Sequence, residues 1–211
     1  MTKVVKYGAV LFTAILVLYF SLDIQILEKH RAAANTTKFN AKDFAAKFWN
    51  ESLPSCLAEA PLLVDVLKIL NENPQKAFET KGRKLGISKT DYFMVSGSGS
   101  IEKVEDEFVT LVLDKQTKIK IATDFIYGNA VRDGSGKVNI NEFLNMTDFN
   151  AVSVAINKLV KENVVARLRK SAAVGKRLEF TGAFEIGEEN IDLSDLLILP
   201  VSVKISDGKS D

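Results

Sequence analysis

The stretch DFNAVSVAINKLVKENVVARLRK, residues 148–170, carries the clearest structural signal in the chain. Its apolar residues recur at the spacing of an α-helix. They are Val152, Ile156, Leu159, Val160, Val164 and Leu168, and charged residues fall on the opposite side. The pattern predicts one long amphipathic helix, capped near Asp148, that packs its apolar stripe against a core.

Short strands are predicted on both sides of this helix, because runs rich in β-branched and aromatic residues alternate with turn-forming residues. Before the helix they span 92–95, 100–104, 108–113, 118–122 and 125–131, and after it 177–186 and 197–205. Turns are expected at 97–99 and 114–116. Pro200 marks the last strand as an edge strand or the site of a bulge.

Two short helices are expected ahead of the strands. The first begins at a cap, Asn40, and Pro54 is expected to break or kink it. One face of it carries three aromatic residues, Phe44, Phe48 and Trp49. The second spans residues 60–71 and ends before an Asn-Pro pair.

This order of elements predicts an α+β fold. A long helix inserted before the last two strands of an antiparallel meander is typical of the small Greek-key barrel of the OB type. We expect residues 39–211 to form one domain of this kind, preceded by a polar linker at 32–38.

The first 31 residues predict a membrane anchor. Residues 7–22, YGAVLFTAILVLYFSL, carry no charge, and a membrane helix needs about 20 mostly apolar residues. A retained signal anchor is favoured, and a cleaved signal peptide or a buried helix are the alternatives. Basic residues flank both ends, so charge only weakly favours a cytosolic N-terminus and a domain outside the inner membrane.

The overall charge argues against nucleic-acid binding. The chain has 211 residues, with 28 Lys and Arg against 27 Asp and Glu, so it has no basic excess to attract a phosphate backbone. Its single cysteine, Cys56, cannot form an intrachain disulfide and has apolar neighbours. We therefore expect Cys56 to be a small buried residue.

The densest polar group beside an apolar run is Asn129, Arg132 and Asp133. One interpretation is a ligand-binding surface on which Arg132 donates two hydrogen bonds to an anionic or hydroxylated partner. The favoured alternative is a structural ion pair between Arg132 and Asp133. Asn145 joins the ligand-binding candidates, although it is also a candidate helix cap.

Catalytic and metal sites are not expected. Residues 133–143, DGSGKVNINEF, resemble part of a calcium-binding loop, but the first ligand position would fall on Val131, which has no side-chain oxygen. The chain has one histidine, His30, which lies just outside the hydrophobic segment and not in the predicted domain. The sequence therefore predicts a non-enzymatic protein without a cofactor.

Several stretches of the chain are distinctive. They are FNAKDFAAKFWNESLPSCL (39–57), YFMVSGSGSIEKVE (92–105), IYGNAVRDGSGKVNINEFLNMTDFNAVSVAINKLV (126–160), GAFEI (182–186) and LILPVSV (197–203). Together they resemble a family of predicted bacterial periplasmic lipoproteins of unknown function. The resemblance implies a domain in the periplasm. It also implies an accessory or ligand-binding role beside ATP-driven sugar transporters, with transporter subunits or a small carbohydrate as partner.

One feature departs from the resemblance. A lipoprotein has a cysteine directly after its signal segment, and Cys56 lies too far along the chain. We therefore expect an uncleaved helix to hold the protein in the membrane. The alternative function is a structural envelope protein that docks a membrane-protein partner through Phe44, Phe48 and Trp49.

Overall fold

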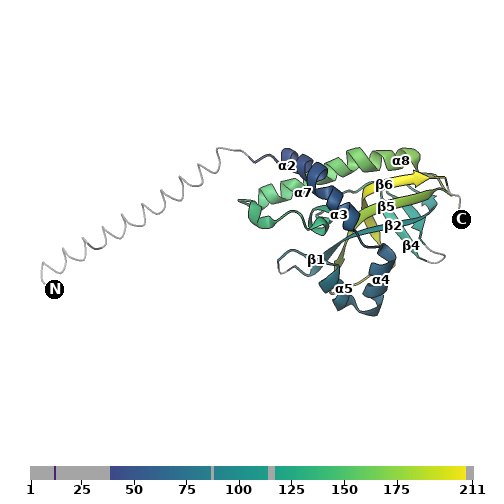
Figure 1. Cartoon of the computed structure of the whole chain (residues 1–211), viewed down its shortest axis with the longest axis horizontal. Helices are drawn as coiled ribbons and strands as arrows, with labels where there is room; N and C mark the ends of the chain where they lie inside the picture. The colour runs from purple at the N-terminus through teal and green to yellow at the C-terminus, as the bar shows by residue number, and fades with distance from the viewer. Residues whose placement is uncertain (1–11, 13–38, 87, 114–116, 208–211) are drawn as a thin grey trace. The chain divides into compact units, whose positions relative to one another are not determined.

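The computed structural model describes residues 12, 39–86, 88–113 and 117–207 (Figure 1). Apart from Phe12, the predicted anchor and linker lie outside the described residues. Ala41–Asp211 form one compact unit. In the described part of the chain, no helix is both long enough and apolar enough to cross a membrane.

Helices precede and interrupt the strands. The first half of the domain contains α2 (Ala41–Lys47), η1 (Phe48–Ser52), α3 (Leu53–Glu59), α4 (Leu63–Glu72), α5 (Pro74–Thr80), β1 (Arg83–Lys84), β2 (Thr90–Val104), β3 (Phe108–Val112) and β4 (Lys118–Ala122). The second half contains α6 (Ala130–Ser135), η2 (Ile140–Glu142), α7 (Met146–Val160), η3 (Lys161–Val165), α8 (Ala166–Ser171), β5 (Arg177–Gly187) and β6 (Leu197–Ser206).

Five of the strands close into a barrel in the order β2-β3-β4-β6-β5, and β5 pairs back onto β2. β4 and β6 run parallel, and the other neighbouring strands run antiparallel. The long helix lies between β4 and β5 in sequence, as in OB-type barrels. The predicted α+β, OB-like architecture is therefore confirmed.

The predicted long helix is present as α7, η3 and α8, which continue one another from Met146 to Ser171. Its cap is Asn145, whose side chain accepts a hydrogen bond from the Asp148 backbone N–H. The helix continues through Pro54, so the predicted break is wrong, whereas a kink at Pro54 stays a prediction. A wider π-helical turn, η1, precedes Pro54, and Pro54 then sits in the first turn of α3, where its missing N–H costs little.

The turn predicted at residues 97–99 is wrong, because β2 runs straight through it. Instead of forming a turn, these glycines allow atoms of the neighbouring strands to lie close to the backbone of β2. A Cβ on Gly97 would lie 2.8 Å from the Phe180 ring, and a Cβ on Gly99 would lie 2.6 Å from the Val112 carbonyl oxygen. Pro200 does lie at a bulge, because the register of β5 against β6 shifts opposite it.

The strand predicted at residues 125–131 is also wrong. Phe125 and Gly128 have φ angles of +42° and +75°, which an extended strand does not accept. Residues 125–129 form a loop, and α6 runs from Ala130 to Ser135 with Gly136 as its C-cap. Gly136 has a φ of +63°, so it forms the left-handed end of this helix.

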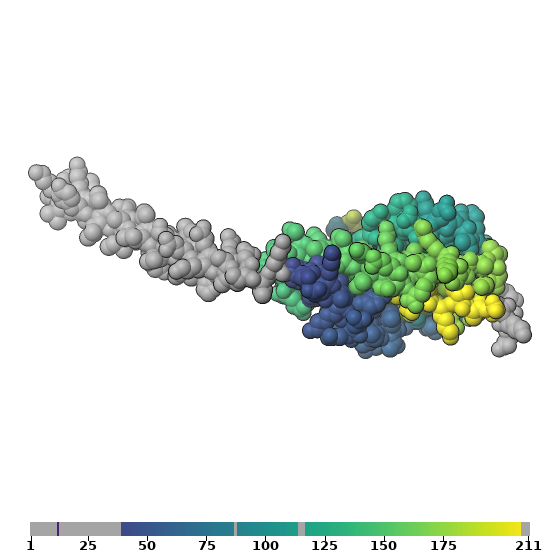
Figure 2. Space-filling view, turned by 90° about the horizontal axis from the view of Figure 1, so that it is seen from above, coloured from purple at the N-terminus to yellow at the C-terminus, as the bar shows by residue number. Residues whose placement is uncertain are grey.

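The core fills the barrel, where Phe93 of β2 stacks on Phe184 of β5 with ring centroids 5.0 Å apart. α6 packs on β2 and β5. α2 packs against α7, and Figure 2 shows this dark-blue helix lying against the green long helix. The loop of residues 125–129 leads into α6 and is hydrogen-bonded to the long helix.

Candidate functional site

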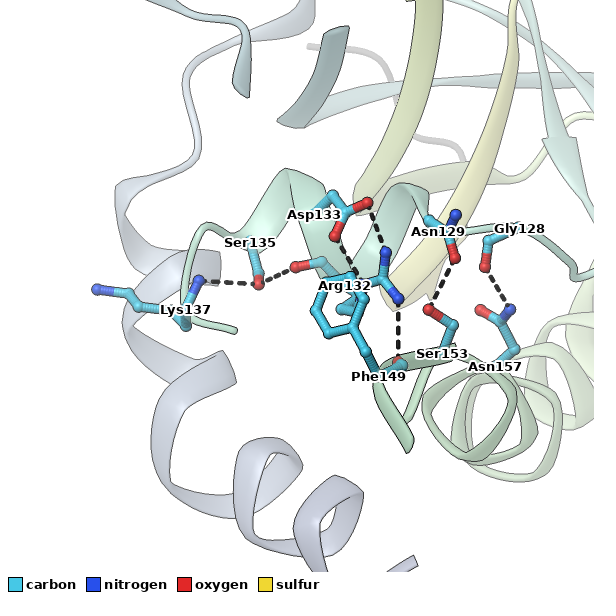
Figure 3. A network of polar contacts seen from close by, with 9 residues as sticks. All are labelled: Gly128, Asn129, Arg132, Asp133, Ser135, Lys137, Phe149, Ser153 and Asn157. Carbon is cyan, nitrogen blue, oxygen red and sulfur yellow. Dashed lines mark hydrogen bonds and ion pairs between the residues drawn. The ribbon is translucent and has the colours of Figure 1, made fainter. Parts of the chain in front are cut away.

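Arg132 and Asp133 lie buried on α6, with Arg132 only 1% exposed. The Arg132 Nε and Nη2 atoms donate to Asp133 Oδ1 and Oδ2 at 2.6 and 2.9 Å (Figure 3). Nη1 donates to the Phe149 carbonyl oxygen at 3.0 Å, and the guanidinium lies 3.5 Å from the centroid of the Phe149 ring. The guanidinium is therefore engaged inside the domain, where it joins α6 to α7.

Asn129 lies beside this pair at the edge of the loop. Its side-chain oxygen accepts a hydrogen bond from Ser153 Oγ at 2.9 Å. One turn further along α7, Asn157 Nδ2 donates to the Gly128 carbonyl oxygen at 2.9 Å (Figure 3). Two side chains of one helix thus hold the loop of residues 125–129 in place.

A groove with a volume of about 380 Å³ lies between this loop and α7. It is lined by Ile126, Tyr127, Gly128, Asn129, Asn150, Ser153, Val154, Asn157, Lys158 and Lys161. Ligand pockets have volumes of about 300–1,000 Å³ and combine apolar or aromatic walls with a few polar groups. This groove has that composition.

Two aromatic side chains of the loop are exposed beside the groove. Phe125 is 53% exposed and Tyr127 is 62% exposed, and their ring centroids are 6.1 Å apart. Exposure of two adjacent rings is unfavourable unless something covers them. Phe125 also has a left-handed backbone, which costs about 1–3 kcal/mol and occurs often at functional sites.

Asn145, the remaining ligand-binding candidate, is used as a helix cap. Its amide also donates to Asp148 Oδ2 at 2.8 Å. The structure brings Asn129 into the groove, and it places Arg132 and Asp133 behind the groove in the interior.

The aromatic face of the first helix is only partly accessible. Phe48 is buried at 3% exposure, whereas Phe44 and Trp49 are half-buried. The Phe44 ring lies 5.2 Å from the Phe143 ring. Phe48 is thus a core residue and cannot be part of a docking surface, so the predicted set is reduced to Phe44 and Trp49.

A family model matches residues 12–204 of the chain. The family is described as "Predicted periplasmic lipoprotein (DUF2291)". The chain belongs to this family. The resemblance inferred from the sequence is thereby confirmed, whereas the link to sugar transporters stays a prediction. No curated protein matches the chain at a significant level.

The fold of this family member is similar to the crystal structure of an OB-fold protein from Thermotoga maritima. The two chains are 24% identical and superpose with a TM-score of 0.73, over 81% of this chain and 100% of the other. At this identity, the similarity concerns the fold alone.

OB folds commonly bind ligands on the face that β3 and β4 form here. In this member of the lipoprotein family, two lysines of β4 are already paired with carboxylates. Lys118 Nζ lies 2.7 Å from Glu102 Oε1, and Lys120 Nζ lies 2.5 Å from Asp195 Oδ1. This face therefore presents no unpaired basic stripe for a nucleic acid among these residues.

The single cysteine of this lipoprotein-family chain is an interior residue. Cys56 is 6% exposed in α3, and its thiol donates to the carbonyl oxygens of Ser52 and Ser135 at 3.4 and 3.6 Å. Burial raises the pKa of this thiol. This position is unsuited to lipid attachment, because the closely packed interior around Cys56 has no room for a lipid chain.

Tyr127, Asn150 and Asn157 line the groove, and none of them was predicted from the sequence as a binding residue. The sequence did contain a pattern that could have identified the helical side of the groove. Asn150, Val154, Lys158 and Lys161 recur at helical spacing on the face opposite the apolar stripe. Only the position of the loop of residues 125–129, which was mistaken for a strand, shows that this face lines a groove.

Proposed function

We propose that this protein is a non-catalytic, ligand-binding accessory protein of the bacterial envelope, and that it binds saccharides in the groove between the loop of residues 125–129 and α7. We further propose that it serves an ATP-driven carbohydrate transporter and that an uncleaved N-terminal helix tethers it to the inner membrane. The observation that carries the binding proposal is an exposed aromatic ring, Tyr127, opposite a row of amide and hydroxyl side chains.

The chemistry of the groove suits a sugar ring. The apolar face of a sugar can lie on the Tyr127 ring, and the hydroxyl groups can bond to amides that both donate and accept. Asn150 is exposed, and its side chain has no partner within the described part of the chain. It is therefore available to a ligand without breaking an existing contact.

The groove is also preformed. Ser153 and Asn157 fix the loop through hydrogen bonds at 2.9 Å each. A loop that is already ordered loses less conformational entropy when a ligand binds. The groove lining contains no carboxylate, imidazole or thiol, and this composition favours binding over acid–base or nucleophilic chemistry.

A thermal-shift screen of the full-length chain against mono- and oligosaccharides tests the proposal. A ligand at 100 times its dissociation constant should stabilise the fold by about 2.7 kcal/mol. Tyr127→Ala and Asn150→Ala should remove the shift while the unliganded melting temperature changes little. Leu144→Ala is the matched control, because Leu144 is 75% exposed and does not line the groove. A shift that survives both groove variants would contradict the assigned site.

A second candidate function is docking of a membrane-protein partner through Phe44 and Trp49, which the half-exposed Trp49 side chain supports. A photo-crosslinker in place of Trp49 should then capture one membrane protein in cells. The same crosslinker in place of Leu144 is the control. Absence of a Trp49-specific adduct would contradict this alternative.

A further inference from the structure

One end of the groove carries positive charge. Among the described residues that line the groove, Lys158 and Lys161 are basic and none is acidic. The whole chain has a net charge of only +1, so the charge of the groove is a local feature. A concave site with one sign of charge concentrates ligands of the opposite sign.

Lys161 is positioned next to the aromatic ring. Its Nζ lies 5.2 Å from the centroid of the Tyr127 ring, a cation–π distance that holds the ammonium over the ring face. A sugar that contacts the part of the Tyr127 ring left uncovered by Lys161 therefore lies next to this ammonium. An ammonium offers three hydrogen-bond donors and no acceptor, so it favours a carboxylate over a hydroxyl group.

Lys158 lies one turn before Lys161 and faces the same groove. Its Nζ is 3.7 Å from Glu162 Oε1, but both side chains are more than half exposed. An exposed pair of this kind contributes little. The Glu162 carboxylate therefore does not prevent Lys158 from turning to an anionic ligand.

We infer that the ligand is an acidic sugar of the uronic acid class, whose carboxylate binds Lys158 and Lys161 while its ring lies against Tyr127. This inference rests on the proposed function, because it assigns the chemical class of the ligand for the same groove. It assigns recognition to two lysines that neither the family description nor the fold implicates.

Galacturonate and galactose are suitable probes, because they differ only in the oxidation state of one carbon. Isothermal titration of the full-length chain should show about three- to tenfold tighter binding of galacturonate at low salt, as two exposed charge contacts allow. Raising the ionic strength should reduce the preference. Lys158→Met and Lys161→Met should abolish it, whereas Lys170→Met, an exposed lysine on α8, should leave it intact.

These experiments distinguish failure of the acidic-sugar inference from failure of the proposed function. If the two sugars bind equally and Tyr127→Ala removes both, the proposed function stands and the acidic-sugar inference is wrong. A galacturonate preference that survives both groove-lysine variants also overturns the inference. If neither these sugars nor any other acidic or neutral sugar binds, both the inference and the proposed function are overturned.

Discussion

Arg132 and Asp133, neighbours along α6, pair side by side through two hydrogen bonds of 2.6 and 2.9 Å in the interior of the domain. The pair uses the geometry with which arginine binds a carboxylate ligand, but both partners belong to the chain. The third hydrogen bond from Arg132, to Phe149, connects α6 to α7. These contacts support the structural ion pair, which was the favoured interpretation of the sequence, over a ligand-binding role for Arg132.

Arg132→Met should destabilise the domain by about 3–5 kcal/mol, because it leaves the buried Asp133 carboxylate without its partner. Urea unfolding measures this change. The double variant Arg132→Met/Asp133→Leu should cost less than the sum of the two single variants, since it removes both charges together. An unchanged unfolding midpoint in Arg132→Met would show that the pair is not structural.

Gly99→Ala should destabilise the barrel by about 1–3 kcal/mol, because the added methyl group meets the Val112 carbonyl oxygen of the neighbouring strand. Gly187→Ala is the matched control in β5. Its Cβ would have no neighbour within 4 Å, and we expect a change within about 0.5 kcal/mol. Equal losses of stability in the two variants would argue against the close approach of β2 and β3 at Gly99.

Asp91 should make the stability of the domain fall with rising pH. It is 2% exposed, and burial raises its pKa, which the charge of Lys84, 3.7 Å away, only partly offsets. A carboxyl group whose pKa is higher in the folded state stabilises the fold below its unfolded pKa and loses this contribution as pH rises through its folded pKa. As the pH rises from 4 to 7, the melting temperature of Asp91→Asn should therefore rise relative to that of the parent protein.

Glu188 supplies a control of the opposite sign. A hydrogen bond from Lys84 lowers the pKa of Glu188, so Glu188 stabilises the fold above its unfolded pKa and loses this contribution as pH falls. As the pH rises from 4 to 7, the melting temperature of Glu188→Gln should fall relative to that of the parent protein. If both variants shift in the same direction, the assigned electrostatic roles are wrong.

Cys56 should be inert in the folded protein. Its thiol is buried and its pKa is raised, and a thiol reacts with maleimides through its thiolate. Labelling followed by mass spectrometry should show slow modification in buffer and rapid modification in urea. The variant Cys56→Ala/Ser55→Cys moves the thiol to the exposed neighbouring position and should react rapidly in buffer. Rapid native labelling of Cys56 would contradict its interior position.

Patterns that extend over many residues predicted the fold well. The apolar stripe between Val152 and Leu168 gave the long helix, and the alternation in residues 118–122 gave β4, because burial of one face imposes each period. The order of these elements then predicted the OB-like barrel.

Predictions that rested on single glycines were less successful, because a glycine can either form a turn or allow another part of the chain to lie close to its backbone. Gly97 and Gly99 permit contact inside a continuous strand, whereas Gly128 does form the loop of residues 125–129. Sequence pattern alone does not separate these uses. The same ambiguity concealed the groove, since a strand was predicted where the loop of residues 125–129 lines it.

Two-dimensional nitrogen–proton NMR spectra of the full-length chain, recorded during titration with a saccharide identified in the thermal-shift screen, show which backbone amides the ligand affects. We expect saturable shifts centred on the backbone amides of Gly128, Asn150 and Asn157, which line the groove, and loss of these shifts in Tyr127→Ala. Shifts centred on β3 and β4, or no shifts with any saccharide tested, would contradict the proposal.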